Sequence, residues 1–95
     1  MHVRFSNRAQ ADLENIRDYL EPRSPQGLER VLSAIFTTIG QLESFPFLGR
    51  AGQVEGTFEI TVPRTTFFVV YTLPDQAYID IEGVIHTSLK YPIET

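Results

Sequence analysis

Three apolar runs separated by two short breaks make up most of the second half of this sequence. The runs are rich in β-branched and aromatic residues and cover Phe58–Val62, Phe67–Leu73 and Tyr78–Ile85. Proline and polar residues fill the breaks, at positions 63–66 and 74–76. Apolar runs of this length with such breaks are typical of strands joined by tight turns. This part of the chain therefore predicts an antiparallel meander of three strands.

The alternation of side chains along a strand predicts two different faces for this sheet. In the first run, Phe58, Ile60 and Val62 fall on one face. Glu59 and Thr61 fall on the other. The third run is assigned in the same way, with these residues on opposite faces: Ile79, Ile81 and Ile85 against Asp80 and Glu82. The middle run is apolar almost throughout, which favours a central strand covered on both faces for part of its length.

The N-terminal half supplies helices that can cover one face. Val3 and Phe5 alternate with polar neighbours, which predicts a short first strand. Asn7 then stands at a helix-capping position, with Gln10 three residues later as in a capping box. Pro22 ends this first helix. Its apolar residues recur at helical spacing: Ala9, Leu13, Ile16 and Leu20.

A second helix is predicted from about Pro25 to Ser44. Ser24 before Pro25 is a favourable start, because serine caps helices and proline fits their first position. Phe36 widens the apolar stripe, whose members are Leu28, Val31, Leu32, Ile35, Ile39 and Leu42. A linker this short predicts an antiparallel helical hairpin. The three glycines of 47–56 predict an irregular loop, and 87–95 a tail or a short terminal turn.

The predicted fold class is α+β, with an N-terminal strand and a two-helix hairpin packed on an antiparallel sheet. We expect a single domain over residues 1–95. The chain has no cysteine, no apolar run long enough to span a membrane and no secretory leader, so a cytoplasmic protein without membrane contact is expected. The net charge of −4 argues against a broad nucleic-acid surface.

The sequence resembles the RelE/ParE toxin superfamily, and most closely its ParE branch, from about Val3 to Pro92. The resemblance rests on the order and spacing of several short segments. These are Ala11-Asp12-Leu13 with Ile16 and Tyr19, Phe45-Pro46-Phe47-Leu48-Gly49-Arg50, Gly56-Thr57-Phe58-Glu59-Ile60, Phe68-Val69-Val70-Tyr71, Val84-Ile85-His86, and Tyr91-Pro92. Two positions depart from it, because ParE-like chains often carry arginine where this one has Phe58 and Gly83.

The resemblance implies a growth-inhibiting toxin of a type II toxin–antitoxin system. In the ParE branch the usual target is DNA gyrase and the partner is a ParD-like antitoxin, and the toxin acts by binding, without a cofactor or metal. In the RelE branch the toxin cuts messenger RNA on the ribosome. A third alternative is a non-toxic module that still binds an antitoxin. None of the three requires sequence-specific binding of nucleic acid by this chain.

A RelE-like ribonuclease needs acids, bases and cations around the scissile phosphate. The positions of this chain that match the RelE catalytic residues carry none of the required cations: Glu59, Thr61, Phe68 and Thr87. His86 is the one weak candidate for a general base, and the competing interpretation is that it ends a strand and is structural. The ParE-like interpretation, without catalysis, is therefore the favoured one.

The candidate contact residues fall into two sets. Residues assigned to the target are Arg50, Arg64, His86, Lys90 and Tyr91. Residues assigned to the antitoxin are exposed aromatics that a small domain cannot bury: Tyr19, Phe36, Phe47 and Phe67. Arg50 is also expected to pair with a carboxylate such as Glu59 or to anchor its loop. The remaining carboxylates are interpreted as solvated helix faces: Asp12, Asp18, Glu29 and Glu43.

Overall fold

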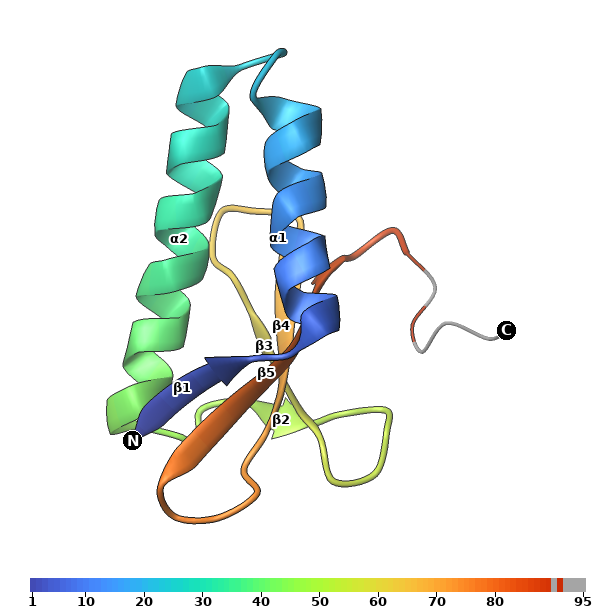
Figure 1. Ribbon diagram of the computed structural model, residues 1–95. Coiled ribbons are helices and arrows are strands. Elements are labelled where there is room, and N and C mark those ends of the chain that lie inside the picture. The colour runs from blue at the N-terminus through green and yellow to red at the C-terminus, as the bar shows by residue number, and fades with distance from the viewer. Residues whose placement is uncertain (90, 92–95) are drawn as a thin grey trace.

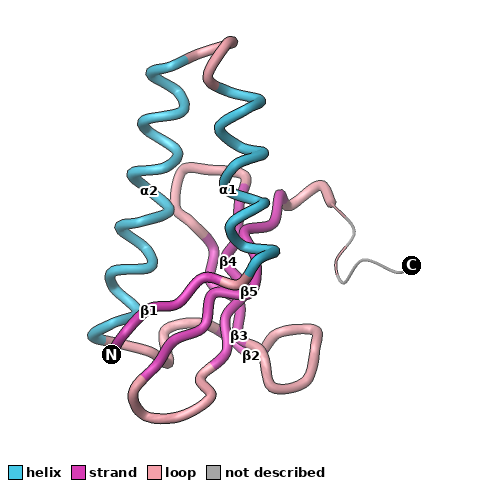
Figure 2. The backbone as a smooth tube through the Cα atoms, viewed as in Figure 1, coloured by secondary structure: helices cyan, strands magenta, loops and turns pink. Residues whose placement is uncertain are grey.

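An antiparallel pair of helices stands against one face of a five-stranded sheet in the computed structural model, which describes residues 1–89 and 91 (Figure 1). Along the chain the elements are β1 (His2–Phe5), α1 (Asn7–Leu20), α2 (Pro25–Ser44), β2 (Arg50–Ala51), β3 (Phe58–Thr61), β4 (Phe67–Thr72) and β5 (Tyr78–His86). The helices run side by side and are joined by a short link at one end (Figure 2). The predicted α+β class and helical hairpin are confirmed.

The sheet has the order β1-β5-β4-β3-β2. The strands β3, β4 and β5 are antiparallel neighbours, so the predicted meander and the central place of β4 are confirmed. The first strand pairs in parallel with β5. The loop predicted to be irregular contains β2, in which Arg50 and Ala51 pair with Glu59 and Phe58. A strand of two residues has no periodicity to detect, so this pairing is visible only in three dimensions.

The first helix is capped by Ser6 and not, as predicted, by Asn7. The Ser6 backbone N–H donates to the carbonyl of Ile81 at 3.0 Å, which holds Ser6 in the extended conformation of β1. Its hydroxyl oxygen accepts the Ala9 N–H at 3.0 Å and donates to the Glu82 carbonyl at 3.0 Å. The cap and the start of the helix therefore lie one residue earlier than the sequence suggests, because the strand pairing fixes where the extended backbone ends.

Replacing Ser6 by alanine is expected to cost about 1–2 kcal/mol of unfolding free energy, because the helix loses its cap and the Glu82 carbonyl its donor. Asn7→Ala is the matched control and should change stability by less than about 0.5 kcal/mol. Urea denaturation of the two variants measures the difference. Equal losses in both variants would show that Ser6 is not the cap.

The core lies between the helices and the sheet. Both predicted helical stripes face it, and its most buried members include Ala9, Ile35, Leu42, Val69 and Tyr71. Phe58 and Ile60 of β3, and Val62 directly after it, contact this core as predicted. The structure confirms the limits predicted for α2, since Ser24 accepts the Gly27 N–H at 3.0 Å at its start.

The prediction that Ile79, Ile81 and Ile85 share one face is wrong for Ile85. The pairing between β4 and β5 shifts by one residue after Val70, which leaves an extra residue in β5 at Glu82. Such a bulge inverts the alternation beyond it. Ile79 and Ile81 belong to the core beneath the helices, whereas Ile85 is buried outside that cluster.

Neither helix in the described part of the chain is both long and apolar enough for a membrane crossing.

Candidate functional site

An apolar groove of about 500 Å³ lies between α1 and the part of the sheet where β5 ends. We call it the hairpin groove. Its apolar lining is contributed by both helices, β4, β5 and the segment after β5: Ile16, Tyr19, Leu20, Val31, Phe67, Val84 and Leu89. Tyr19 and Leu89 at its rim are 60% and 48% exposed. Large apolar side chains exposed around a hollow are typical of a protein-binding surface.

Tyr19 is held in place on the rim of this groove. The guanidinium of Arg23 lies 4.0 Å from the centre of the Tyr19 ring and also donates to the Tyr19 carbonyl at 2.6 Å. An aromatic ring fixed in this way loses little freedom when a partner covers it.

Asp12 lies at the edge of the groove and is not a simple solvated residue, contrary to prediction. Its carboxylate accepts the Val84 N–H at 2.9 Å and lies 3.6 Å from the Arg8 guanidinium. The cause is that β1 pairs with β5 only as far as Ile81, so α1 supplies the acceptor beyond that point. The other three carboxylates of this group are exposed, as predicted: Asp18, Glu29 and Glu43.

His86 is the last residue of β5 and also lines the hairpin groove. Its Nδ1 accepts the Ser88 N–H at 3.0 Å, and the ring stands edge-on against Phe67, with 5.3 Å between ring centres. These contacts agree with the structural interpretation of His86.

The opposite face of the sheet, which we call the open face, carries the four positions that the sequence analysis matched to RelE catalytic residues. A depression of about 410 Å³ is lined there by all four of them together with Tyr91: Glu59, Thr61, Phe68 and Thr87. The four positions named through the resemblance therefore lie together in the folded chain.

Glu59 is nearly buried on this face, with 4% of its surface exposed. Its carboxylate accepts the Gln53 N–H at 2.9 Å and lies 3.4 Å from the Arg50 guanidinium. The predicted Arg50–Glu59 pair is confirmed. Burial raises the pKa of the Tyr91 hydroxyl, and the negative charge of Glu59 raises it further. The depression therefore holds an ion pair, formed by the buried Glu59 carboxylate and the exposed Arg50 guanidinium.

The two positions that depart from the ParE pattern lie in different surroundings. Phe58 stacks on Tyr71 with 5.4 Å between ring centres and contacts the core. A Cβ atom at Gly83 would lie 3.3 Å from the Asp12 carboxylate and 3.7 Å from the Arg8 guanidinium. An Arg8 side chain from α1 thus lies beside the place where β5 has no side chain.

The residues predicted to contact a target do not form one surface. Arg50 and Tyr91 line the same depression on the open face. Arg64 lies in the turn between β3 and β4, and His86 lines the hairpin groove. Lys90 lies outside the described residues. The assignment of these residues to a target remains a prediction.

The residues predicted to contact an antitoxin are also divided. Tyr19 and Phe67 line the hairpin groove. Phe36 packs against Phe5 of β1, with 6.2 Å between ring centres, and does not line the hairpin groove. Phe47 packs against Phe58, with 6.1 Å between ring centres, and does not line the hairpin groove.

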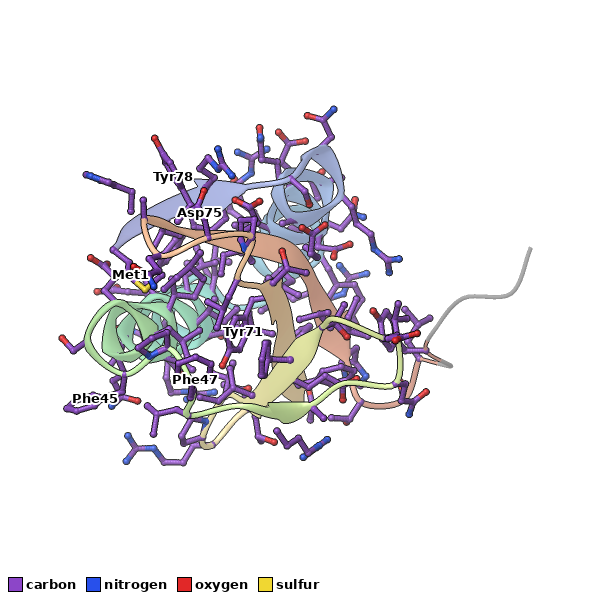
Figure 3. All side chains as sticks on the ribbon, turned by 90° about the horizontal axis from the view of Figure 1, so that it is seen from below. Met1, Phe45, Phe47, Tyr71, Asp75 and Tyr78 are labelled. Atoms are coloured by element: carbon purple, nitrogen blue, oxygen red, sulfur yellow. The ribbon has the colours of Figure 1, made fainter. Side chains whose placement is uncertain are left out.

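The loop after α2 presents a second apolar surface that was not predicted as a unit. Phe45, Phe47 and Leu48 are 64%, 75% and 53% exposed. The buried Tyr71 hydroxyl anchors the loop from below, since it donates to the Pro46 carbonyl at 2.8 Å and accepts the Gly49 N–H at 3.0 Å. Figure 3 shows Tyr71 in the interior and Phe45 at the periphery. The run of apolar residues around Pro46 was the signal available in the sequence.

Within residues 1–89 and 91, no group of three or more histidine or acidic side chains is placed to hold a metal ion.

A comparison with protein families gives the class of this chain. A family model described as "ParE toxin of type II toxin-antitoxin system, parDE" matches residues 3–91. The chain therefore belongs to the ParE toxin family of the RelE/ParE superfamily, and it is a toxin of the type II toxin–antitoxin class.

Individual relatives agree with this assignment. A curated protein of Sinorhizobium fredii described as "Putative toxin Y4kP" is 27% identical over 90 residues, which cover 95% of this chain and 92% of that protein. The solved "Chromosomal ParDE TA system from P. aeruginosa" has a similar fold, with a TM-score of 0.67, 23% identity and coverage of 90% and 95% of the two chains. The toxin–antitoxin complex RelBE2 from Mycobacterium tuberculosis matches with a TM-score of 0.59, 28% identity and the same coverage.

Proposed function

We propose that this chain inhibits DNA gyrase by binding it, and that a ParD-like antitoxin holds it inactive. The observation that carries the proposal is the match of residues 3–91 to the ParE toxin family. Gyrase and the ParD-like partner come from the resemblance to the ParE branch.

The open face supports action by binding. A ribonuclease would need a free base and a cation directed at the phosphate. The Glu59 carboxylate is instead buried and engaged by Gln53 and Arg50, and it would repel a phosphate. His86 lies on the other face of the sheet, in the hairpin groove. Its ring cannot act with Glu59 on one substrate atom.

The hairpin groove is the proposed seat of the antitoxin. Its apolar lining suits the apolar face of an amphipathic helix, which places side chains in such grooves at helical spacing. An antitoxin segment of this kind is disordered when free and folds when it binds the groove. We expect the antitoxin to contact Tyr19, which Arg23 holds in place, and the exposed Leu89.

The test is a supercoiling assay with purified gyrase, relaxed plasmid and the full chain. We expect inhibition or trapped cleaved DNA at micromolar protein, and recovery when the cognate antitoxin is mixed with the chain beforehand. Chain mixed with an unrelated antitoxin is the control for nonspecific recovery. Circular dichroism on the same sample establishes that the protein added is folded.

Two results would contradict the proposal. Normal supercoiling together with cleavage of messenger RNA on ribosomes would assign this chain to the ribonuclease alternative. Normal supercoiling without cleavage, but with a tight antitoxin complex, would assign it to the non-toxic binding alternative.

A further inference from the structure

A cleft of about 540 Å³ separates the middle of α2 from the turn between β3 and β4. Figure 1 shows this turn rising beside the helices. The helix contributes Arg30, Ser33 and Thr37 to the lining, and the turn contributes Arg64 and Thr65. We call it the arginine cleft. It is separate from both the hairpin groove and the open face.

The arginine cleft is positive in a chain whose net charge is −4. None of its described lining residues is acidic. The ion pairs found in residues 1–89 and 91 use Arg4, Arg8, Arg17 and Arg50, and neither arginine of the cleft. The helix itself offers Arg30 no acidic neighbour, because the residues three and four positions away are Gln26, Gly27, Ser33 and Ala34.

Arg64 occupies a backbone conformation that glycine favours. Its φ angle is 61°, and the Thr65 N–H donates to the Val62 carbonyl at 3.3 Å, as in a type II turn after proline. A side chain at this position of the turn is strained. An arginine at a strained position, beside a second arginine that also makes no ion pair within residues 1–89 and 91, points to a ligand for its side chain.

We propose that the arginine cleft binds a phosphate group. Each planar guanidinium offers paired N–H donors that match an oxyanion. A carboxylate has two oxygens, which one guanidinium can occupy, whereas a phosphate has enough oxygens and charge for both arginines. The hydroxyls of Ser33 and Thr37 add neutral donors on the helical side. The phosphate belongs either to a nucleic-acid backbone or to a free nucleotide, and this inference does not depend on gyrase being the target.

The test measures binding of phosphate-bearing probes to the full chain at low and moderate salt. The probes are inorganic phosphate, a nucleoside monophosphate and a short fluorescein-labelled DNA duplex. Arg30→Gln and Arg64→Gly are each expected to weaken binding about tenfold and to reduce the salt dependence by about one charge. Arg17→Gln is the matched control, because Arg17 is an exposed helical arginine paired with Asp18 outside the cleft.

Thermal unfolding separates a ligand role of Arg64 from a structural one. Arg64→Gly should raise Tm by about 2–5 °C while it weakens binding, because glycine relieves the strain of the turn. If the chain binds the DNA duplex more tightly than the mononucleotide, the phosphate comes from a nucleic-acid backbone. If it binds the mononucleotide more tightly, the phosphate comes from a free nucleotide.

Four outcomes would overturn the proposal. The first is that no phosphate probe binds saturably, and the second is that Arg17→Gln weakens binding as much as the cleft variants. The third is that a polyglutamate peptide binds as tightly as the phosphate probes with the same dependence on Arg30 and Arg64, which would assign the cleft to an acidic protein. The fourth is that Arg64→Gly lowers Tm.

Discussion

Replacing Tyr19 by alanine is expected to weaken the complex with the cognate antitoxin by about 30-fold, which corresponds to about 2 kcal/mol. The Tyr19 ring is 60% exposed, stands at the rim of the hairpin groove and is fixed by the Arg23 guanidinium. Aromatic residues with these properties contribute most to protein interfaces, because a partner covers a large area without having to order the side chain. Titration calorimetry with the purified antitoxin measures the effect.

Phe47→Ala is the matched control for this experiment. Phe47 is even more exposed, at 75%, and was assigned to the antitoxin from the sequence on the same grounds as Tyr19. It lies at the loop after α2, away from the hairpin groove, so its removal should leave the affinity within about threefold of the parent. A larger loss with Phe47→Ala than with Tyr19→Ala would move the antitoxin site to that loop. Both side chains are largely exposed to solvent, so both variants should remain folded.

The sequence predicted the elements whose boundaries are set locally. The start of α2 follows from Ser24 and Pro25 alone, and the structure places it there. The cap of α1 depends on a distant residue, since Ser6 is held extended by the Ile81 carbonyl. The face of Ile85 depends on an extra residue in β5 that only the register with β4 reveals. Each error comes from a pairing between segments far apart in the chain.

The candidate sites show the same division. The Arg50–Glu59 pair was predictable, because a short loop returns the arginine beside the next strand. Which exposed aromatics share a groove was not, since Tyr19 and Phe67 come from segments that meet only in the folded chain. The arginine cleft was missed for the same reason. Arg64 was noted in its turn, but nothing in the sequence places Arg30 beside it.

Tyr71→Phe is expected to cost about 1–3 kcal/mol of unfolding free energy, and Tyr71→Ala about 3–5 kcal/mol. Tyr71 is fully buried, and its hydroxyl holds the Pro46 carbonyl and the Gly49 N–H. Phenylalanine leaves both groups without this partner, and alanine also leaves a cavity beneath Phe58. A domain of this size has about 5–14 kcal/mol in total, so the alanine variant loses a large share.

Alkaline pH gives a second measure of the same hydroxyl. Burial raises the pKa of Tyr71 above its ordinary value of 10.0, and the hydrogen bond from Gly49 offsets part of this rise. The folded chain therefore retains a proton that the unfolded chain releases, so stability is complete below about pH 10 and falls as the pH rises through the folded-state pKa. Tyr71→Phe should make this fall shallower. Some of it should remain, because the pKa of Tyr91 is also raised.

Tyr78→Phe is the control that separates a lost hydrogen bond from a lost hydroxyl. The Tyr78 hydroxyl makes no hydrogen bond with the residues that the structure describes, and its ring keeps the Arg4 guanidinium at 3.9 Å with or without the oxygen. The unfolding free energy of the Tyr78→Phe variant should stay within about 0.5 kcal/mol of the parent. Hydrogen exchange supplies the local readout, since Tyr71→Phe should accelerate the Gly49 amide more than the amides of β4. Uniform acceleration would show that Tyr71 stabilises the whole core and does not specifically anchor the loop that carries Phe45 and Phe47.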